Sequence, residues 1–202
     1  MEKAALIGIS RHRIATDGKG VTTLVAFHGC PLRCEYCLNP QCLIKEDKWK
    51  LYDCELLYKE VRIDELYFLA TGGGIVFGGG EPCQQSDFIT DFRELCGSQW
   101  QISVETSLNV PRKHLEKLLP IIDHYIIDIK DIDKERYLRY TKKGNEQVIN
   151  NLEWLIAQGK SEQMIIRVPL IPLYNTEANV EKSIHQLEKM GVTHFDRLTY
   201  RT

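Results

Sequence analysis

Three cysteines in one short loop are the residues of this sequence best suited to chemistry. Cys30, Cys34 and Cys37 follow the apolar run 24–27 and have the spacing C-x3-C-x2-C. Soft thiolates select zinc or iron–sulfur clusters. A structural zinc site takes four protein ligands, and an ordinary iron–sulfur cluster takes four thiolates. Three thiols are therefore one ligand short, and a [4Fe-4S] cluster held by them would leave one iron open for a small molecule.

A zinc site is the alternative for this loop. His28 or Cys42 lies close enough in the sequence to supply a fourth ligand. The remaining cysteines, Cys54, Cys83 and Cys96, fall in or beside predicted helices, where a buried thiol behaves as a small hydrophobic side chain.

Composition limits the classes of protein to which the chain can belong. Its 202 residues lie within the range of one domain, which we expect to span residues 1–202. The 26 basic and 28 acidic residues are scattered and give a net charge of −2, which does not favour nucleic-acid binding. No apolar run approaches the length of a membrane span, and the N-terminus lacks the features of a secretory signal. Seven cysteines, an odd number, favour metal or redox chemistry in a cytoplasmic protein.

The elements that must position the cysteine loop alternate along the chain. Hydrophobic periodicity, caps and glycine or proline breaks predict strands at 21–28, 75–77, 102–106, 124–130, 164–170 and 195–200. The same signals predict helices at 53–69, from Ser86, and at 111–119, 133–140, 146–158 and 176–190. This alternation predicts an α/β fold with a parallel sheet and right-handed crossovers.

Polar and charged residues gather at the predicted carboxyl ends of these strands. In parallel sheets, ligands bind at that edge. The residues found there, besides the cysteine loop, are Gly79, Gly80, Glu81, Glu105, Thr106, Asp128, Lys130 and Arg167.

The cysteine loop resembles the cluster motif of the radical S-adenosylmethionine (SAM) superfamily, which has an aromatic residue, here Tyr36, before the last cysteine. The resemblance implies a [4Fe-4S] cluster on Cys30, Cys34 and Cys37, with SAM chelating the open iron. One electron from the cluster would then cleave SAM to a 5′-deoxyadenosyl radical. The implied architecture is a partial, open (β/α)6 barrel with the cluster at its carboxyl-end rim.

The turn after the second predicted strand resembles a second motif of the superfamily. Gly79-Gly80-Glu81 matches the GGE sequence that contacts the methionine amino group, although a tight strand-to-helix turn would also explain two glycines. The resemblance also leads us to expect SAM contacts from Leu38 and Asn39, beside the third cysteine.

Other segments are similar to a narrower group, the activating enzymes of glycyl-radical enzymes. DGKGV at 17–21 resembles their D-G-P-G-[IV] segment, with Lys19 in place of proline. DIK at 128–130 and IRVPLIP at 166–172 match further segments of that group. The run 133–152 resembles their D-x3-H-x3-T-G signature, with Tyr137 at the histidine position and one inserted residue. The chain lacks a ferredoxin-like insert and so resembles the minimal, single-cluster form.

The resemblance assigns SAM contacts to Asp128, Lys130 and Arg167. Considered alone, Asp128 and Lys130 could be an ion pair on one strand face. Arg167 lies within an apolar strand, where a guanidinium needs an anionic partner.

Two further assignments rest on the same resemblance. Glu105 and Thr106, together with Asp128, would hold a monovalent cation. Arg201 occupies the position of a cofactor-contacting histidine, and it can donate hydrogen bonds but cannot accept them.

The implied reaction is abstraction of a glycine α-hydrogen from a partner glycyl-radical enzyme. The cofactor carries the chemistry, so no side chain is expected to be catalytic, and a flavodoxin or ferredoxin-type reductant is implied. We expect a monomer with no nucleic-acid or membrane partner. The alternatives are radical SAM modification of another polypeptide, such as a ribosomal peptide, and a zinc-stabilised binding module.

Overall fold

The computed structural model describes residues 2–14, 16–45 and 49–200. The chain divides into two compact units, which are described separately. Unit 1 contains the residues up to Cys30, Asn39–Thr106 and Pro111–Tyr125, and unit 2 contains Pro31–Leu38, Ser107–Val110 and the residues from Ile126 onward. The expectation of one domain over residues 1–202 stays a prediction.

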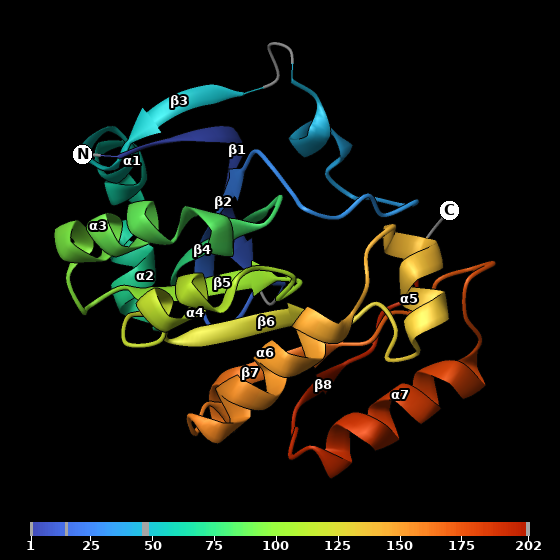
Figure 1. Cartoon of the computed structure of the whole chain (residues 1–202). Helices are drawn as coiled ribbons and strands as arrows, with labels where there is room; N and C mark the ends of the chain where they lie inside the picture. Colours follow the sequence, from blue (N-terminus) through green and yellow to red (C-terminus); the bar gives the residue numbers. More distant parts are fainter. Residues whose placement is uncertain (1, 15, 46–48, 201–202) are drawn as a thin grey trace. The chain divides into compact units, whose positions relative to one another are not determined.

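Unit 1 is built on a five-stranded sheet with the strand order β3-β1-β2-β4-β5 (Figure 1). Strand β1 runs antiparallel to β2 and β3, whereas β2, β4 and β5 run parallel to one another. The strands are β1 (Lys3–Ile14), β2 (Val21–Phe27), β3 (Lys50–Asp53), β4 (Gly74–Gly79) and β5 (Gln101–Thr106).

The core of unit 1 is aromatic. Phe27 of β2 stacks on Phe77 of β4 at 5.4 Å between ring centroids and meets Phe88 edge-on at 5.7 Å. Phe92 meets Phe77 edge-on at 5.5 Å, and all four rings are fully buried. Rings of this size bury large apolar areas and prefer offset or edge-to-face contacts, which fixes the position of α3 on the sheet.

The helices of unit 1 follow the predicted order with one break. Asp53 caps the first helix as predicted, since its carboxylate accepts a hydrogen bond from Leu56 N at 2.8 Å. The prediction of one continuous helix at 53–69 is wrong, because a 3-10 turn at Arg62–Asp64 divides this segment into two helices. The turn brings the buried Asp64 carboxylate to Arg11. The helical elements are η1 (Pro40–Leu43), α1 (Cys54–Val61), η2 (Arg62–Asp64), α2 (Glu65–Thr71), η3 (Pro82–Gln85), α3 (Ser86–Cys96) and α4 (Arg112–Leu118).

Unit 2 continues the alternation of strands and helices. Its strand order is β6-β7-β8, and β7 pairs with β8 in parallel. Asp133 caps α5 by accepting from Arg136 N at 3.0 Å, and Thr176 forms a capping box with Asn179 at the start of α7. The elements are β6 (His124–Asp128), which begins in unit 1, α5 (Lys134–Thr141), α6 (Glu146–Ala157), η4 (Ser161–Gln163), β7 (Met164–Arg167), α7 (Glu177–Lys189) and β8 (Phe195–Asp196).

The structure confirms the predicted α/β class with an open, mostly parallel sheet. Strand β3 is an edge strand of unit 1, and β8 is an edge strand of unit 2. Strands β1 and β3 were not predicted. Strand β1 is apolar in its first half and polar in its second, and only Ala4 and Leu6 are buried, so it lacks the regular alternation that predicts a strand.

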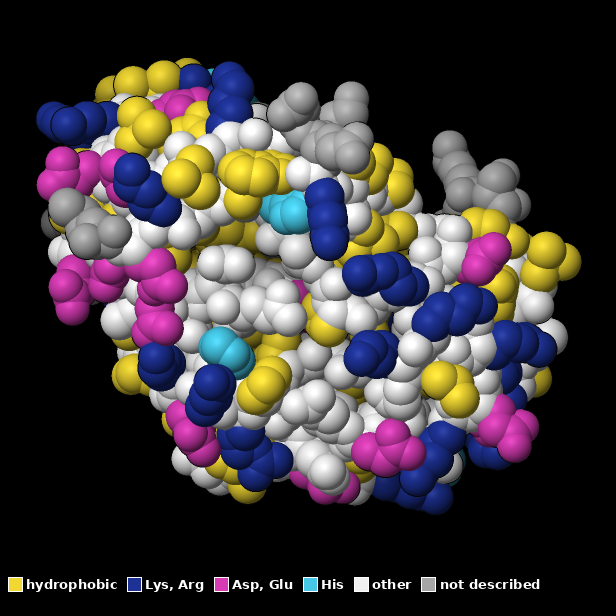
Figure 2. Space-filling view, turned by 45° about the horizontal axis from the view of Figure 1, so that its top comes forward, with side chains coloured by type: hydrophobic (Ala, Val, Ile, Leu, Met, Phe, Trp, Pro, Cys, Tyr) yellow, Lys and Arg dark blue, Asp and Glu magenta, His cyan; other side chains and the backbone are white. Residues whose placement is uncertain are grey.

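The surface agrees with the scattered charge of the sequence. Acidic side chains lie among the basic ones on the face seen in Figure 2. In the described part of the chain, no helix combines the length and apolar character needed to cross a membrane.

Candidate functional site

The three cysteines of the loop differ in environment from most of the other cysteines. Each is half-buried and none of the seven cysteines is in a disulfide, whereas the fully buried thiols are Cys42, Cys54 and Cys83. Cys30 belongs to unit 1, and Cys34 and Cys37 belong to unit 2. Among residues 2–14, 16–45 and 49–200, no group of three or more His, Cys, Asp or Glu side chains is placed to hold a metal ion.

The glycine turn after β4 lies directly on the backbone that leads into the cysteine loop. Gly80 N donates to Phe27 O at 2.9 Å, and Glu81 N donates to Gly29 O at 2.8 Å. An added Cβ on Gly80 would lie 2.0 Å from Gly29 O, and Gly79 has a φ of +88°. Gly80 is needed because any side chain would collide with Gly29 O, and Gly79 is needed because its φ is one that residues with a side chain rarely adopt. Both glycines therefore have a structural role in the fold.

The carboxylate of Glu81 is held inside unit 1. Glu81 is almost completely buried, and its Oε1 accepts from Thr106 Oγ1 at 2.5 Å and from Cys83 N at 3.2 Å. The predicted residues Glu81 and Thr106 are therefore brought together at the ends of β4 and β5. Glu105 lies over Gly78, where an added Cβ would come within 3.0 Å of its Oε2.

The residues that follow the third cysteine take different positions. Asn39 Nδ2 donates to Gly79 O at 3.2 Å, so this side chain braces the glycine turn in unit 1. Leu38 is 76% exposed.

In unit 2, Lys130 is the centre of a buried polar cluster. Its Nζ donates to Asp128 Oδ2 at 2.9 Å and to Tyr200 OH at 2.6 Å. Burial alone would lower the pKa of Lys130, but the attraction of Asp128 and Tyr200 outweighs it and raises the pKa well above its ordinary value. The ammonium therefore stays charged, although Lys130 is only 8% exposed.

Asp128 and Lys130 form the ion pair that was the alternative explanation for their presence on one strand. This ion pair does not account for the second carboxylate oxygen of Asp128. Asp128 Oδ1 is buried and has no hydrogen-bond partner among the described residues. A buried carboxylate oxygen without a partner carries a desolvation cost, which a ligand could relieve. Burial also raises the pKa of the nearby Cys34 thiol, and the charge of Lys130 opposes that rise.

The segment from Arg33 to Cys37 is anchored on the end of α5. Arg33 N donates to Thr141 O at 2.9 Å, and Tyr140 OH donates to Tyr36 O at 3.3 Å. The Tyr36 ring lies 6.4 Å from the Tyr140 ring and 5.9 Å from the Tyr174 ring. The aromatic residue of the cysteine motif therefore packs within a tyrosine cluster.

Arg167 lies in an apolar strand, where its guanidinium was expected to need an anionic partner, and Asp196 is that partner. Its Nε donates to Asp196 Oδ2 of β8 at 3.1 Å. Sequence reasoning missed Asp196 and Tyr200, because no local pattern relates them to Arg167 and Lys130. Arg201 lies outside the described residues.

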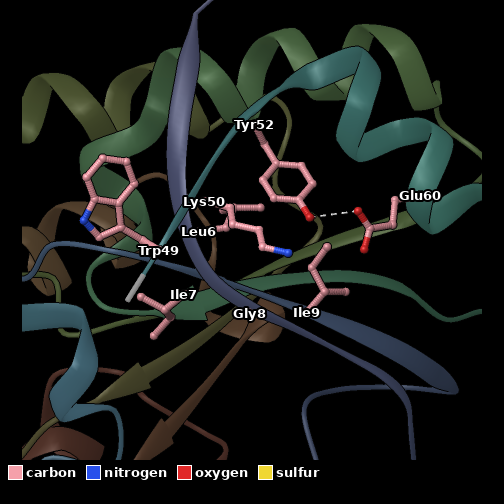
Figure 3. A pocket seen from close by; sticks show the side chains of 8 residues that line it. All are labelled: Leu6, Ile7, Gly8, Ile9, Trp49, Lys50, Tyr52 and Glu60. Carbon is pink, nitrogen blue, oxygen red and sulfur yellow. Dashed lines mark hydrogen bonds between the residues drawn. The ribbon is translucent and has the colours of Figure 1, made fainter. Parts of the chain in front are cut away.

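The pocket shown in Figure 3 is a separate feature of unit 1. It has a volume of about 400 Å³ and lies between β1, the start of β3 and α1, where Tyr52 OH donates to Glu60 Oε2 at 2.9 Å. None of the predicted site residues lines it.

Comparison with known proteins identifies the family. The sequence profile of the radical SAM superfamily matches residues 24–187. The chain is 30% identical to the (2S)-3-sulfopropanediol dehydratase activating enzyme of Klebsiella oxytoca, over 83% of this chain and 72% of that protein. It is also 30% identical to the pyruvate formate-lyase-activating enzyme of Listeria monocytogenes, over 92% of this chain and 77% of that protein.

A solved structure shows the same fold. SuiB of Streptococcus suis, bound to its precursor peptide SuiA, matches with a TM-score of 0.67 at 13% identity. The match covers 85% of this chain, which spans only 37% of the SuiB chain.

The chain therefore belongs to the radical SAM superfamily. Within that superfamily it is an enzyme of the activating-enzyme type, as the segments at 17–21 and 128–130 predicted.

Proposed function

We propose that this enzyme is an activase that generates a glycyl radical in a partner protein. The observation that carries the proposal is the pairing of the C-x3-C-x2-C and GGE motifs in a chain with 30% identity to two activating enzymes. The radical SAM family supplies the cofactor class, and the activating-enzyme relatives supply the class of partner.

The donor set of the loop fits a [4Fe-4S] cluster held by Cys30, Cys34 and Cys37. All three thiols are half-buried and outside disulfides, so they are available as thiolate ligands. When reduced, the cluster would supply the electron that cleaves a carbon–sulfur bond of bound SAM. His28, the alternative zinc ligand, has its Nε2 2.8 Å from Ile44 O.

The chain's own residues would bind the polar groups of SAM. In unit 1 the buried Glu81 carboxylate suits the methionine amino group. In unit 2 the charged Lys130 suits a carboxylate, and the unpartnered Asp128 Oδ1 suits a hydroxyl or ammonium donor. Tyr36, Leu38, Asn39, Gly79, Gly80, Arg167 and Arg201 complete the proposed set of cofactor contacts.

The proposed reaction balances with one electron. SAM, one electron and the glycine Cα–H give methionine, 5′-deoxyadenosine and a glycyl radical, and the hydrogen moves from the glycine Cα to the 5′ carbon. No side chain needs to act as a general base. The electron would come from a flavodoxin or ferredoxin-type reductant.

Three finer points belong to the same proposal. Glu105, Thr106 and Asp128 would bind a monovalent cation. We also propose that the enzyme acts as a monomer in the cytoplasm.

Electron paramagnetic resonance tests the proposal. The anaerobically reconstituted, dithionite-reduced protein is incubated with SAM and a glycyl-radical enzyme, beginning with the pyruvate formate-lyase that the names of its relatives indicate, and a glycyl doublet is expected. The matched variants are Cys34→Ala, which should abolish SAM cleavage, and Cys54→Ala, which should retain it because the Cys54 thiol is buried and donates to Phe88 O at 3.3 Å.

Two results would overturn the proposal in different ways. SAM cleavage without a doublet would indicate another polypeptide substrate, such as a ribosomal peptide. Tight binding of one zinc ion, without uptake of iron and sulfide, would indicate a zinc-stabilised binding module.

A further inference from the structure

A turn after β7 in unit 2 holds a leucine out in solvent. Leu173 is 87% exposed, the largest exposure among the large hydrophobic residues described. Its φ is +68°, in the left-handed region that glycine occupies at least cost. A turn that served only to reverse the chain would be more stable with glycine here, so the leucine side chain carries a cost in the isolated protein.

The turn is held in one conformation by hydrogen bonds. Tyr174 N and Asn175 N donate to Ile171 O at 3.0 and 3.1 Å, and Ile171 N donates to Asn175 Oδ1 at 2.6 Å. From outside the turn, Arg139 donates to Tyr174 O at 2.8 Å. The exposed leucine is therefore presented by a braced turn, which keeps the entropy cost of binding through it low.

The turn lies beside the cysteine segment within unit 2. The Tyr174 ring contacts the Tyr36 ring edge-on at 5.9 Å and the Tyr140 ring at 5.0 Å. Tyr36 immediately precedes Cys37. A protein bound at Leu173 would therefore be held next to the segment that carries two of the three proposed cluster ligands.

The surroundings of the turn are apolar and basic. Leu138 on α5 is 52% exposed, and the guanidinium of Arg139 lies 5.2 Å from the centroid of the Tyr174 ring. Residues 134–143 carry five basic side chains and one acidic side chain. Of these, Arg136 is paired with Asp131 at 2.8 Å, and Lys134 lies 3.4 Å from Glu146. Arg139, Lys142 and Lys143 therefore carry the remaining positive charge. Lys142 in this run has Glu35 at 3.8 Å, a distance at which an exposed pair contributes little. The charge of this surface is complementary to an acidic partner.

We propose that the Leu173 turn is the anchor through which this enzyme docks its polypeptide substrate. Leu173 enters an apolar socket on the partner, and the basic residues around α5 face an acidic rim of that socket. An apolar anchor surrounded by polar contacts is the usual arrangement of energetically dominant interface residues. The inference rests on the proposed activase function, because it takes the glycyl-radical enzyme as the docked protein.

The test compares two exposed leucines. Leu173→Ala removes the anchor, and Leu66→Ala removes a side chain of similar exposure, 79%, on α2 in unit 1. Three quantities are measured on the reconstituted enzyme: 5′-deoxyadenosine formation without partner, the dissociation constant for the glycyl-radical enzyme by biolayer interferometry, and the KM for that partner in glycyl-radical formation.

We expect Leu173→Ala to raise both the dissociation constant and the KM by about tenfold, the size of effect that separates anchor residues from neutral contacts. Partner-independent SAM cleavage and the melting temperature should match those of the wild type. Leu66→Ala should leave all the measured quantities unchanged. Leu173→Gly, which relieves the strained backbone, should melt at a higher temperature than the wild type yet bind the partner as weakly as Leu173→Ala.

The possible results separate the two proposals. Wild-type affinity in Leu173→Ala, or an equal loss in Leu66→Ala, overturns the anchor and leaves the activase function standing. Partner binding that is weakened by Leu173→Ala without any glycyl doublet in the wild type supports the anchor and overturns the activase function. Absence of both binding and radical formation in the wild type overturns both.

Discussion

Lys130 donates two hydrogen bonds, one to a neighbouring carboxylate and one to a phenol 70 positions later in the chain. The carboxylate supplies charge, whereas the hydroxyl of Tyr200 limits the directions in which the ammonium can point. The Lys130 ammonium also lies 5.3 Å from the centroid of the Tyr200 ring. Tyr200 is therefore a positioning residue for the proposed SAM-binding lysine.

At this scale, Tyr200→Phe should weaken SAM binding. The ring and its packing are kept, but Lys130 loses one acceptor, so the dissociation constant for SAM should rise roughly fivefold. Anaerobic calorimetry on the reconstituted enzyme measures this, and iron content should not change. The matched variant is Tyr52→Phe, which loses the bond to Glu60 Oε2 in unit 1 and should keep wild-type SAM affinity. Equal affinities in Tyr200→Phe and the wild type would contradict the positioning role.

At the scale of elements, the ends of β2 and β4 are joined through the glycine turn. Phe27 pairs with Gly79, and the backbone of Gly80 and Glu81 continues this contact onto the residues that lead into Cys30. The backbone that leads into Cys30 and the GGE turn are consequently parts of one local arrangement in unit 1.

We therefore expect Gly80→Ala to be destabilising. The added Cβ would meet Gly29 O at 2.0 Å, and the strand ends must separate to avoid that contact. Overpacking of this kind costs about 1–3 kcal/mol. Gly8→Ala is the control, because its Cβ would meet no atom within 4 Å. Urea unfolding measures both variants, and a Gly80→Ala protein as stable as Gly8→Ala would show that the close approach is not required.

At the scale of the whole molecule, pH should act on stability through Asp64. This carboxylate is completely buried and accepts from Arg11 Nε at 2.8 Å and Thr23 Oγ1 at 2.9 Å, while His12 Nε2 lies 2.9 Å away. Burial alone would raise the pKa of Asp64, but the hydrogen bonds from Arg11 and Thr23 outweigh burial and lower it. The cluster joins β1, β2 and η2.

A carboxylate with a depressed pKa stabilises the fold above its unfolded pKa of about 3.9. That contribution should fall as the pH drops below about 4 and be lost below the folded pKa. Asp64→Asn should cost about 1–3 kcal/mol at neutral pH, because the hydrogen bonds from Arg11 and Thr23 to a buried carboxylate are weakened, and should flatten the acid side of the stability profile. Urea unfolding from pH 3 to 7 measures both effects.

Asp133→Asn is the matched variant for this measurement. Asp133 also has a lowered pKa, caused first by the backbone hydrogen bond from Arg136, but it is an exposed helix cap. Its loss should cost about 1 kcal/mol. An Asp64→Asn protein that kept the wild-type acid slope would show that another group controls acid unfolding.

Features that depend on neighbouring residues could be predicted from the sequence. The spacing of the three cysteines, the GGE turn and the alternation of strands and helices are local patterns, and they were sufficient to predict the superfamily and the α/β class. The cap at Asp53 followed from the same kind of local signal. The weakly periodic strand β1 and the short strand β3 escaped this reasoning.

Contacts between side chains that are distant in the sequence became apparent in the folded chain. Arg11 and Asp64 are 53 positions apart, Arg167 and Asp196 are 29 apart, and Lys130 and Tyr200 are 70 apart. No periodicity relates such residues, because their contact is created by strand order and by the path of the connecting helices. The exposed, left-handed Leu173 was likewise invisible in the sequence, since a leucine near a proline gives no sign of its φ or its exposure.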